Sequence, residues 1–251
     1  MIASIQKAMR ILSTVSDGGM TPTPLCVIAE RTGINKATCS RIIGTLVSDG
    51  YLVKISASRG YTLGPAAYCL CCFGRYGGNL ISVCHPFMQY LYNTLGHCAV
   101  LAVIEGSTKY LIDYIDDGSI FEQKKKIRKD DIYRTATGRA ILSHMSRDET
   151  LAVWQKYGAP NTEEWPEIKT LNDLLDYRID ANSVVTTRME HTSGEVSLGY
   201  AIAVMRDTRC VGALGIAVKT PKSEEKAFRE RDEKSIIKHL MKVAPLISAR
   251  L

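Results

Sequence analysis

The sequence predicts an α+β protein in two parts: an amino-terminal winged helix-turn-helix domain and a larger α+β domain with an antiparallel sheet, joined by a linker helix. Two short amphipathic helices meet at a glycine turn within residues 25–51, and a small hairpin follows them directly. From Gly96 onward, apolar runs rich in β-branched residues predict strands in an early and a late part of the domain, with helical segments between them. This order is typical of an antiparallel sheet flanked by helices. The expected boundaries are 1–64 for the winged domain, 65–78 for the linker helix and 79–251 for the larger domain.

The first two helices are expected to pack against each other in the small domain. The first runs from Ser4, its N-cap residue, to Ser16. Its apolar stripe consists of Ile5, Ala8, Met9, Leu12 and Val15. Thr23 is expected to cap the second helix, with Pro24 at its first helical position. Gly33 ends that helix, because a residue without Cβ adopts the left-handed turn at low cost.

The third helix is expected to begin after the N-cap residue Asn35 and to end at Asp49-Gly50. Its apolar stripe consists of Cys39, Ile42, Ile43, Leu46 and Val47. The outer face is polar and basic, with no acidic residue before Asp49. In a helix-turn-helix unit this helix enters the major groove, where Lys36 and Arg41 reach phosphates or guanine edges. An ordinary helical hairpin with a solvated face is the alternative.

The segment after Gly50 favours DNA binding over that alternative. Residues 51–55 and 61–63 form a hairpin with a polar tip that contains Arg59. Such a wing supplies a second contact to the DNA backbone or the minor groove. The residues expected to contact double-stranded DNA are Thr23, Asn35, Lys36, Ala37, Thr38, Ser40, Arg41, Thr45, Ser58 and Arg59.

Composition and charge agree with a nucleic-acid-binding protein. The chain has 251 residues, is 45% hydrophobic and carries a net charge of +6. Residues 1–64 hold seven basic and three acidic side chains, so +4 of that charge lies on the small domain, as expected of a phosphate-backbone binder. The sequence has no apolar run long enough to cross a bilayer and no evident secretory signal. We therefore expect a cytoplasmic protein with no membrane partner.

The cysteines and histidines give no support to a metal site or an enzyme. The chain has eight cysteines, but the 69–72 cluster followed by Cys84-His85 lacks the paired spacing of a zinc site, and buried thiols are expected instead. His97 and Cys98 are neighbours in an expected strand, so their side chains point to opposite faces. No nucleophile-elbow, phosphate-loop or zinc-protease motif is present. We expect no catalysis, no metal and no cofactor.

Four segments resemble the amino-terminal domain of the isocitrate lyase regulator (IclR) family of bacterial transcription factors, and a looser similarity covers almost the whole chain. These segments are Ser4–Leu12, Ile34–Arg41, Asp49–Leu52 and Arg59–Gly64. The resemblance implies a GAF-like effector-binding domain after the linker helix. It also implies that the linker helix contributes to dimerisation, so a homodimer or a homotetramer built as a dimer of dimers is expected.

The linker region itself is unusually apolar. A helix is expected at 65–73, a joint at Gly74, Gly77 and Gly78, and a longer helix at 79–95 that contains Pro86. The apolar segment is covered either by a second copy of the chain, which the resemblance favours, or by the larger domain. Further strands are expected at 97–104, 109–115, 184–189, 196–205 and 210–219, and helices at 134–145, 148–157, 171–182 and 223–251. The basic run 123–129 is given no role.

A ligand site is expected where a helix with small residues begins. Free N–H groups and the helix dipole at Ala136, Thr137 and Gly138 are suited to a carboxylate, and the resemblance implies that this segment lines the effector pocket. The family's polar pocket positions, one cysteine and two hydroxyl residues, align here with Gly199, Gly215 and Ala217, and Glu190 is a candidate rim group. Because small residues at these positions leave space and offer no hydrogen-bonding side chain, we expect a bulkier and more apolar effector, such as an aromatic or acyl carboxylate.

The expected function is a transcriptional regulator that controls a catabolic operon in response to a small organic effector. The competing interpretation is a constitutive DNA-binding protein whose larger domain binds no ligand and serves only for interaction.

Overall fold

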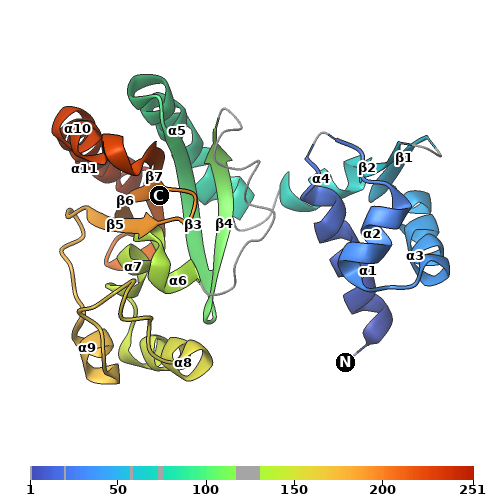
Figure 1. Ribbon diagram of the computed structural model, residues 1–251, viewed down its shortest axis with the longest axis horizontal. Helices are drawn as coiled ribbons and strands as arrows, with labels where there is room; N and C mark the ends of the chain where they lie inside the picture. Colours follow the sequence, from blue (N-terminus) through green and yellow to red (C-terminus); the bar gives the residue numbers. More distant parts are fainter. Residues whose placement is uncertain (1, 20, 57–58, 73–75, 117–130) are drawn as a thin grey trace. The chain divides into compact units, whose positions relative to one another are not determined.

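The computed structural model describes residues 2–19, 21–56, 59–72, 76–116 and 131–251. The chain divides into two compact units, Met1–Gly78 and Asn79–Leu251, each with its own core (Figure 1). Within the described residues, no helix has the length and apolar character needed to cross a membrane. Ser58 and the basic run 123–129 lie outside the described residues.

The smaller unit is a winged helix-turn-helix (Figure 1). Its elements are α1 (Ala3–Ser16), α2 (Leu25–Thr32), α3 (Lys36–Ser48), β1 (Leu52–Ser56), β2 (Gly60–Leu63) and α4 (Pro65–Cys72). The three helices and the wing meet in one core, in which Ile11, Ile28 and Ile43 are almost fully buried. The stripe expected on the first helix is wrong for Ile5 and Met9, which are exposed, and Ile11 enters the core beside Leu12 and Val15 instead. Gly33 ends α2 in the left-handed conformation with φ 67°, as the sequence predicted. The two strands of the wing pair antiparallel.

Two of the three expected helix caps are wrong. Neither α1 nor α2 has a side-chain cap, because Ile2 and Pro24 occupy the N-cap positions. Thr23 is buried instead and forms a two-way backbone bridge with Tyr61, with N···O distances of 2.8 and 3.0 Å. A long-range pairing therefore replaces the local cap. Asn35 does cap α3: its side-chain oxygen accepts a hydrogen bond from the Thr38 amide at 2.8 Å.

The Thr23 bridge anchors the wing to the helices and depends on a glycine. Gly60 has φ 102°, and a Cβ placed there would lie 2.2 Å from the Thr23 carbonyl oxygen. Only a residue without a side chain allows this approach.

The larger unit is an α+β domain on one antiparallel sheet of order β4-β3-β7-β6-β5 (Figure 1). Its strands are β3 (Cys98–Glu105), β4 (Thr108–Ile115), β5 (Val185–Glu190), β6 (Glu195–Arg206) and β7 (Arg209–Pro221). Its longer helices are α5 (Ser82–Leu95), α7 (Ala136–Leu142), α8 (Arg147–Tyr157) and α11 (Lys234–Ser248). Its shorter helices are α6 (Asp131–Arg134), α9 (Leu171–Asp176), η2 (Lys222–Glu224), α10 (Glu225–Phe228) and η3 (Arg229–Glu233). The π-helical turn η1 (Tyr76–Ile81) contains the boundary between the two units.

The helices of this unit cover both faces of the sheet. The start of α7 lies on β6 and β7, over Gly199 and Gly215. Tyr200, the neighbour of Gly199, points to the opposite face, where its hydroxyl donates to Glu233 at 3.0 Å. On that second face α11 packs against β6, with α5 beside it.

Several expected helices are shorter or interrupted. The helix expected at 134–145 breaks at Thr135, whose side chain accepts from the Gly138 amide, so that a local cap starts a new helix. The helix expected at 171–182 ends at Asp176, because Tyr177 is extended. The expected glycine joint is wrong for Gly77 and Gly78, which belong to the π-helical turn η1 that leads into α5. Pro86 lies inside α5.

Candidate nucleic-acid interface and effector site

The outer face of α3 is the candidate nucleic-acid interface. Cys39, Ile43 and Leu46 are buried against α1 and α2, which turns the polar positions of the helix toward solvent. Asn35, Lys36, Ala37, Ser40, Arg41 and Thr45 are exposed there, and Thr38 is partly exposed. No carboxylate within α3 competes for Lys36 or Arg41, so both cations are available to phosphates or base edges.

The other predicted contacts divide into two groups. Arg59 lies at the exposed tip of the wing, where its amide donates to the Ser56 hydroxyl at 3.0 Å. Thr23 is buried in the bridge to Tyr61, so the structure removes it from the predicted contact surface. Its role is to hold the wing.

In the larger unit, the start of α7 lies directly on the sheet. All seven residues of α7 are buried. The N-cap residue Thr135 also accepts a hydrogen bond from the Lys109 ammonium at 2.7 Å. Gly138 allows the close packing between α6 and α7, since a Cβ there would lie 2.1 Å from the Ile132 carbonyl oxygen.

The expected space at Gly199 and Gly215 does not exist. A Cβ on Gly215 would lie 2.7 Å from the Thr137 methyl carbon, and one on Gly199 would lie 3.3 Å from the Ala136 Cβ. The missing side chains are replaced by α7 itself, which approaches the sheet closely. Ala217 pairs with Gly199 across the β6–β7 ladder and is partly exposed. The start of α7 therefore fills the space in which the sequence placed an enlarged pocket.

Glu190 is not a rim group of that site. The Thr187 hydroxyl is on the α7 face, 2.6 Å from where a Gly199 Cβ would stand. Because side chains alternate along a strand, Arg188 and Glu190 face the other way. They line the side of the sheet on which η2 and α10 lie, where Arg188 binds Glu225 at 2.9 Å.

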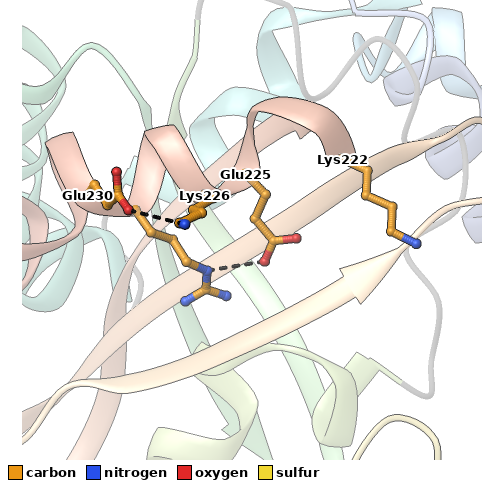
Figure 2. Close-up of a pocket in the computed structure, with 5 residues that line it drawn as sticks. Lys222, Glu225, Lys226 and Glu230 are labelled. Atoms are coloured by element: carbon orange, nitrogen blue, oxygen red, sulfur yellow. Dashed lines mark hydrogen bonds and ion pairs between the residues drawn. The ribbon is translucent and has the colours of Figure 1, made fainter.

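An open pocket of about 330 Å³ occurs on that opposite side (Figure 2). Its lining residues are all charged: Lys222, Glu225, Lys226, Arg229 and Glu230. Most of these groups already have partners: Arg229 binds Glu225 at 3.1 Å, and Lys222 binds Glu190 at 2.6 Å. A pocket whose charges neutralise one another has no strong preference for an ionic ligand.

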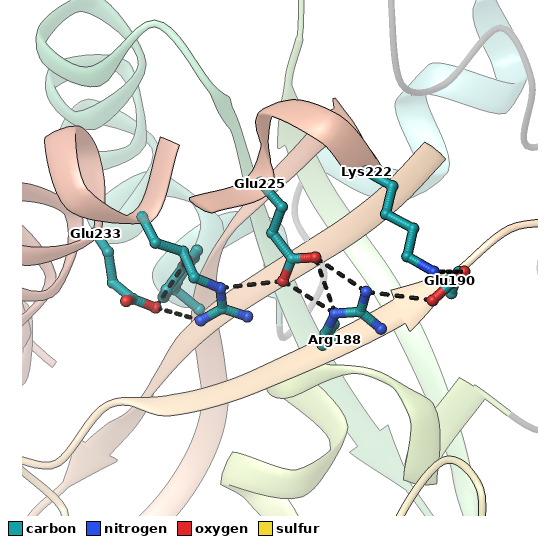
Figure 3. A network of polar contacts seen from close by, with 7 residues as sticks. Arg188, Glu190, Lys222, Glu225 and Glu233 are labelled. Atoms are coloured by element: carbon teal, nitrogen blue, oxygen red, sulfur yellow. Dashed lines mark hydrogen bonds and ion pairs between the residues drawn. The ribbon is translucent and has the colours of Figure 1, made fainter. Parts of the chain in front are cut away.

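The same charges continue as a ladder from Lys222 and Glu190 to Glu233 (Figure 3), and Glu233 accepts a hydrogen bond from the Tyr200 hydroxyl. Glu190 joins Lys222 and Arg188, and these two cations hold the pKa of its carboxyl below its ordinary value. At the far end, burial and the Glu233 carboxylate raise the pKa of the Tyr200 hydroxyl. These ion pairs and hydrogen bonds hold the segment 222–233 against β5 and β6, on the face of the sheet opposite α7.

Two arginines that the sequence did not single out are central to the α7 face. Arg139 is buried, donates to the Tyr133 and Glu164 carbonyl oxygens at 2.7 and 2.5 Å, and lies 4.3 Å from the centre of the Trp165 ring. Arg134 contacts the Met189 sulfur at 2.8 Å and the Glu164 carboxylate at 3.0 Å. Their position just before and within α7 was the available signal, but Glu164, Trp165 and Met189 are distant from them in sequence.

His97 and Cys98 point to opposite faces. The His97 ring packs edge-on against Phe228 at 5.5 Å, and burial lowers its pKa. Cys98 is 2% exposed and pairs with Ala217 on the face covered by α7. In the described parts of the chain, no three His, Cys, Asp or Glu side chains converge as metal ligands.

A winged helix with a basic exposed α3, followed by an α+β domain, defines the class of two-domain DNA-binding regulators. The family models agree. Residues 4–56 match the IclR helix-turn-helix domain, and residues 77–249 match the bacterial transcriptional regulator IclR C-terminal domain. The chain belongs to the IclR family of bacterial transcriptional regulators, and it is not an enzyme.

Relatives of the chain within this family are distant in sequence. The HTH-type transcriptional regulator Rv1719 of Mycobacterium tuberculosis is 25% identical over 222 residues, which covers 88% of this chain and 82% of the relative. The acetate operon repressor of Salmonella typhimurium is 19% identical over 160 residues, covering 62% of this chain and 58% of the repressor.

Solved structures share the fold over nearly the full chain. An IclR homologue from Microbacterium hydrocarbonoxydans, complexed with 4-hydroxybenzoate, has a TM-score of 0.71 at 18% identity and covers 99% of this chain and 98% of its own. Thermotoga maritima IclR has a TM-score of 0.61 at 18% identity and covers 100% and 99%.

Proposed function

We propose that the protein controls a catabolic operon by placing α3 in the major groove of an operator and by responding to a small organic carboxylate, preferably an aromatic one. The observation that carries the proposal is the exposed face of α3, where Lys36 and Arg41 stand among small hydroxyl groups with no acidic residue on the helix. Its place of action is the cytoplasm, where bacterial DNA lies.

The acting species is a homodimer or a dimer of dimers. Two copies present two α3 helices to half-sites about 34 Å apart, or one turn of DNA. Exposed apolar side chains in the smaller unit support self-association: Ile5 and Met9 on α1 are 53% and 58% exposed, and Leu70 on α4 is 67% exposed.

Replacing Arg41 by alanine is expected to lower operator affinity by about 5- to 150-fold, because the groove then holds one cation fewer for a phosphate or a base edge. Binding is measured by fluorescence anisotropy on a duplex from the region upstream of the protein's own gene. Arg31→Ala is the matched control, since Arg31 is an exposed arginine at the end of α2 and off the face of α3. Equal affinities for Arg41→Ala and the wild type would remove Arg41 from the proposed interface.

The α7 face supports a carboxylate as the effector. Thr187, Gly199, Ala217 and Met189 share that face. The Nε of Arg134 faces the Glu164 carboxylate, but its Nη2 lies against the Met189 sulfur, a weak acceptor that an anion can replace. Gly199 and Ala217 offer no side-chain hydrogen bond, which favours an apolar body on the ligand. The 4-hydroxybenzoate bound to the Microbacterium homologue has that character.

Melting in the presence of acids tests the effector. A ligand at about 100 times its Kd adds about 2.7 kcal/mol to stability, and about 1 kcal/mol corresponds to about 2–4 °C for a chain of this size. We expect 4-hydroxybenzoate to raise Tm by about 5–10 °C, and the corresponding benzyl alcohol, which lacks the carboxylate, to raise it little. Arg134→Met is expected to abolish the shift.

Two results of this melting experiment would contradict the proposed effector in different ways. Stabilisation by glyoxylate but not by aromatic acids would exclude the aromatic preference. No shift with any acid would favour the second candidate, a constitutive DNA-binding protein, which the close packing of α7 on Gly199 and Gly215 also fits.

A further inference from the structure

Helix α11 carries charge of one sign, although acidic residues occur in the segment 224–233 that precedes it. Helix α11 has lysines at 234, 238 and 242, all exposed and spaced four residues apart, and Arg250 follows two residues after the helix. Neither α11 nor the neighbouring helix α5 contains an aspartate or glutamate. We call Lys234, Lys238, Lys242 and Arg250 the α11 basic stripe.

Stability does not explain the α11 basic stripe. Like charges at a spacing of four residues lie on neighbouring turns of a helix and destabilise it by about 0.2–0.5 kcal/mol for each pair. In the described part of the chain, no carboxylate forms an ion pair with Lys234, Lys238 or Lys242. By contrast, three other lysines of this domain have acidic partners: Lys219 binds Glu195 at 2.6 Å, Lys222 binds Glu190 at 2.6 Å and Lys226 lies 4.0 Å from Glu230.

Aromatic rings of α5 orient two of the cations. The Lys242 ammonium lies 5.7 Å from the centre of the Tyr90 ring, and the Arg250 guanidinium lies 4.9 Å from the centre of the Phe87 ring. Both cations keep their charge toward solvent, since Lys242 and Arg250 are exposed. The helix rise places Lys234 and Lys242 about 12 Å apart, so the stripe is an elongated cationic surface.

We propose that the α11 basic stripe binds the phosphate backbone of the DNA that flanks the operator. The inference rests on the proposed function, because the DNA held by α3 is then present at high effective concentration near the second domain. DNA is the expected partner because a row of cations is complementary to the phosphates of a duplex, which follow one another about every 3.4 Å along each strand. A second copy of the same face is a poor partner because it carries the same charge.

The test measures the salt dependence of binding by the full chain on two duplexes. The short one covers the footprint alone, about 30 base pairs or three turns, and the long one extends it to about 150 base pairs. The variant is Lys238→Gln combined with Lys242→Gln. The matched control is Lys169→Gln combined with Lys226→Gln, which removes the same charge from exposed lysines beside Asp173 and Glu230.

We expect the stripe variant to make the slope of log K against log salt shallower on the long duplex, by about 0.9 for each phosphate that the protein no longer neutralises, and to leave the short duplex unaffected. The control is expected to match the wild type on both. Equal slopes for all three proteins would overturn the proposal and direct the search to an acidic protein partner. Equally shallow slopes for the stripe variant and the control would also overturn it, because the effect would then come from the net charge of the protein and not from the α11 basic stripe. A failure of the proposed function is distinguished from a failure of this proposal by a different result: the Arg41→Ala variant would then bind the operator as tightly as the wild type.

Discussion

Replacing Gly138 by alanine is expected to destabilise the larger domain by about 4 kcal/mol or more. A loss of that size is a large part of the total free energy of unfolding of a typical domain. The new Cβ would lie 2.1 Å from the Ile132 carbonyl oxygen and 2.9 Å from the Ile132 Cα. Both are backbone atoms, so no side chain can rotate away. Relief requires α6 and α7 to separate, and that would also move the start of α7 over Gly199.

Tryptophan fluorescence during urea unfolding measures this effect selectively, because both tryptophans of the chain, Trp154 and Trp165, belong to the larger unit. Gly44→Ala is the control. Gly44 is an exposed glycine inside α3 of the smaller unit, and a Cβ placed on it would meet no atom within 4 Å, so its replacement by alanine is expected to leave the tryptophan transition unchanged. A Gly138→Ala protein with an unchanged tryptophan transition would contradict the described packing.

Replacing Arg139 by methionine is expected to cost about 2–4 kcal/mol. Methionine keeps the unbranched apolar chain but leaves the Tyr133 and Glu164 carbonyl oxygens without their donors, and each unsatisfied buried group costs about 1–3 kcal/mol. The stacking of the guanidinium on Trp165 at 4.3 Å disappears as well. The same tryptophan transition reports the change in stability.

The control for Arg139 is Arg147→Met. Arg147 is 66% exposed in its side chain and its ion pair with Asp176 spans 3.6 Å in solvent, so the change is expected to stay within about 0.5 kcal/mol. If Arg139→Met unfolds at the same urea concentration as Arg147→Met, the buried guanidinium is not what holds the 158–165 segment to α7.

Local patterns were sufficient to predict the winged helix-turn-helix fold of the smaller domain and the order of strands and helices, but not every helix cap. The stripe of Cys39, Ile43 and Leu46 determined which face of α3 is buried, and Gly33 ended α2 where its missing Cβ predicted. Thr23 was misplaced because its partner, Tyr61, comes from the wing. A local cap and a long-range bridge compete for the same residue, and only the folded arrangement decides between them.

The ligand site was less predictable for the same reason. A glycine in a strand marks either space for a ligand or a close approach of another backbone, and the sequence does not distinguish these. At Gly199 and Gly215 the approaching element is α7, which lies far earlier in the chain. Glu190 was assigned to the wrong face because the side of a strand that meets α7 depends on register, which the pairing of Thr187 with Gly199 sets.

The role of α3 is tested most directly by a base-substitution scan of the operator, after footprinting of the protein's own upstream region. Affinities for every single base-pair change are measured for the wild type and for Arg41→Ala. We expect the wild type to lose about 1–3 kcal/mol of binding free energy at related positions of two half-sites about 34 Å apart, and Arg41→Ala to flatten the profile there and nowhere else. A profile for Arg41→Ala that runs parallel to the wild type at every position, or a wild type indifferent to sequence and salt, would contradict it.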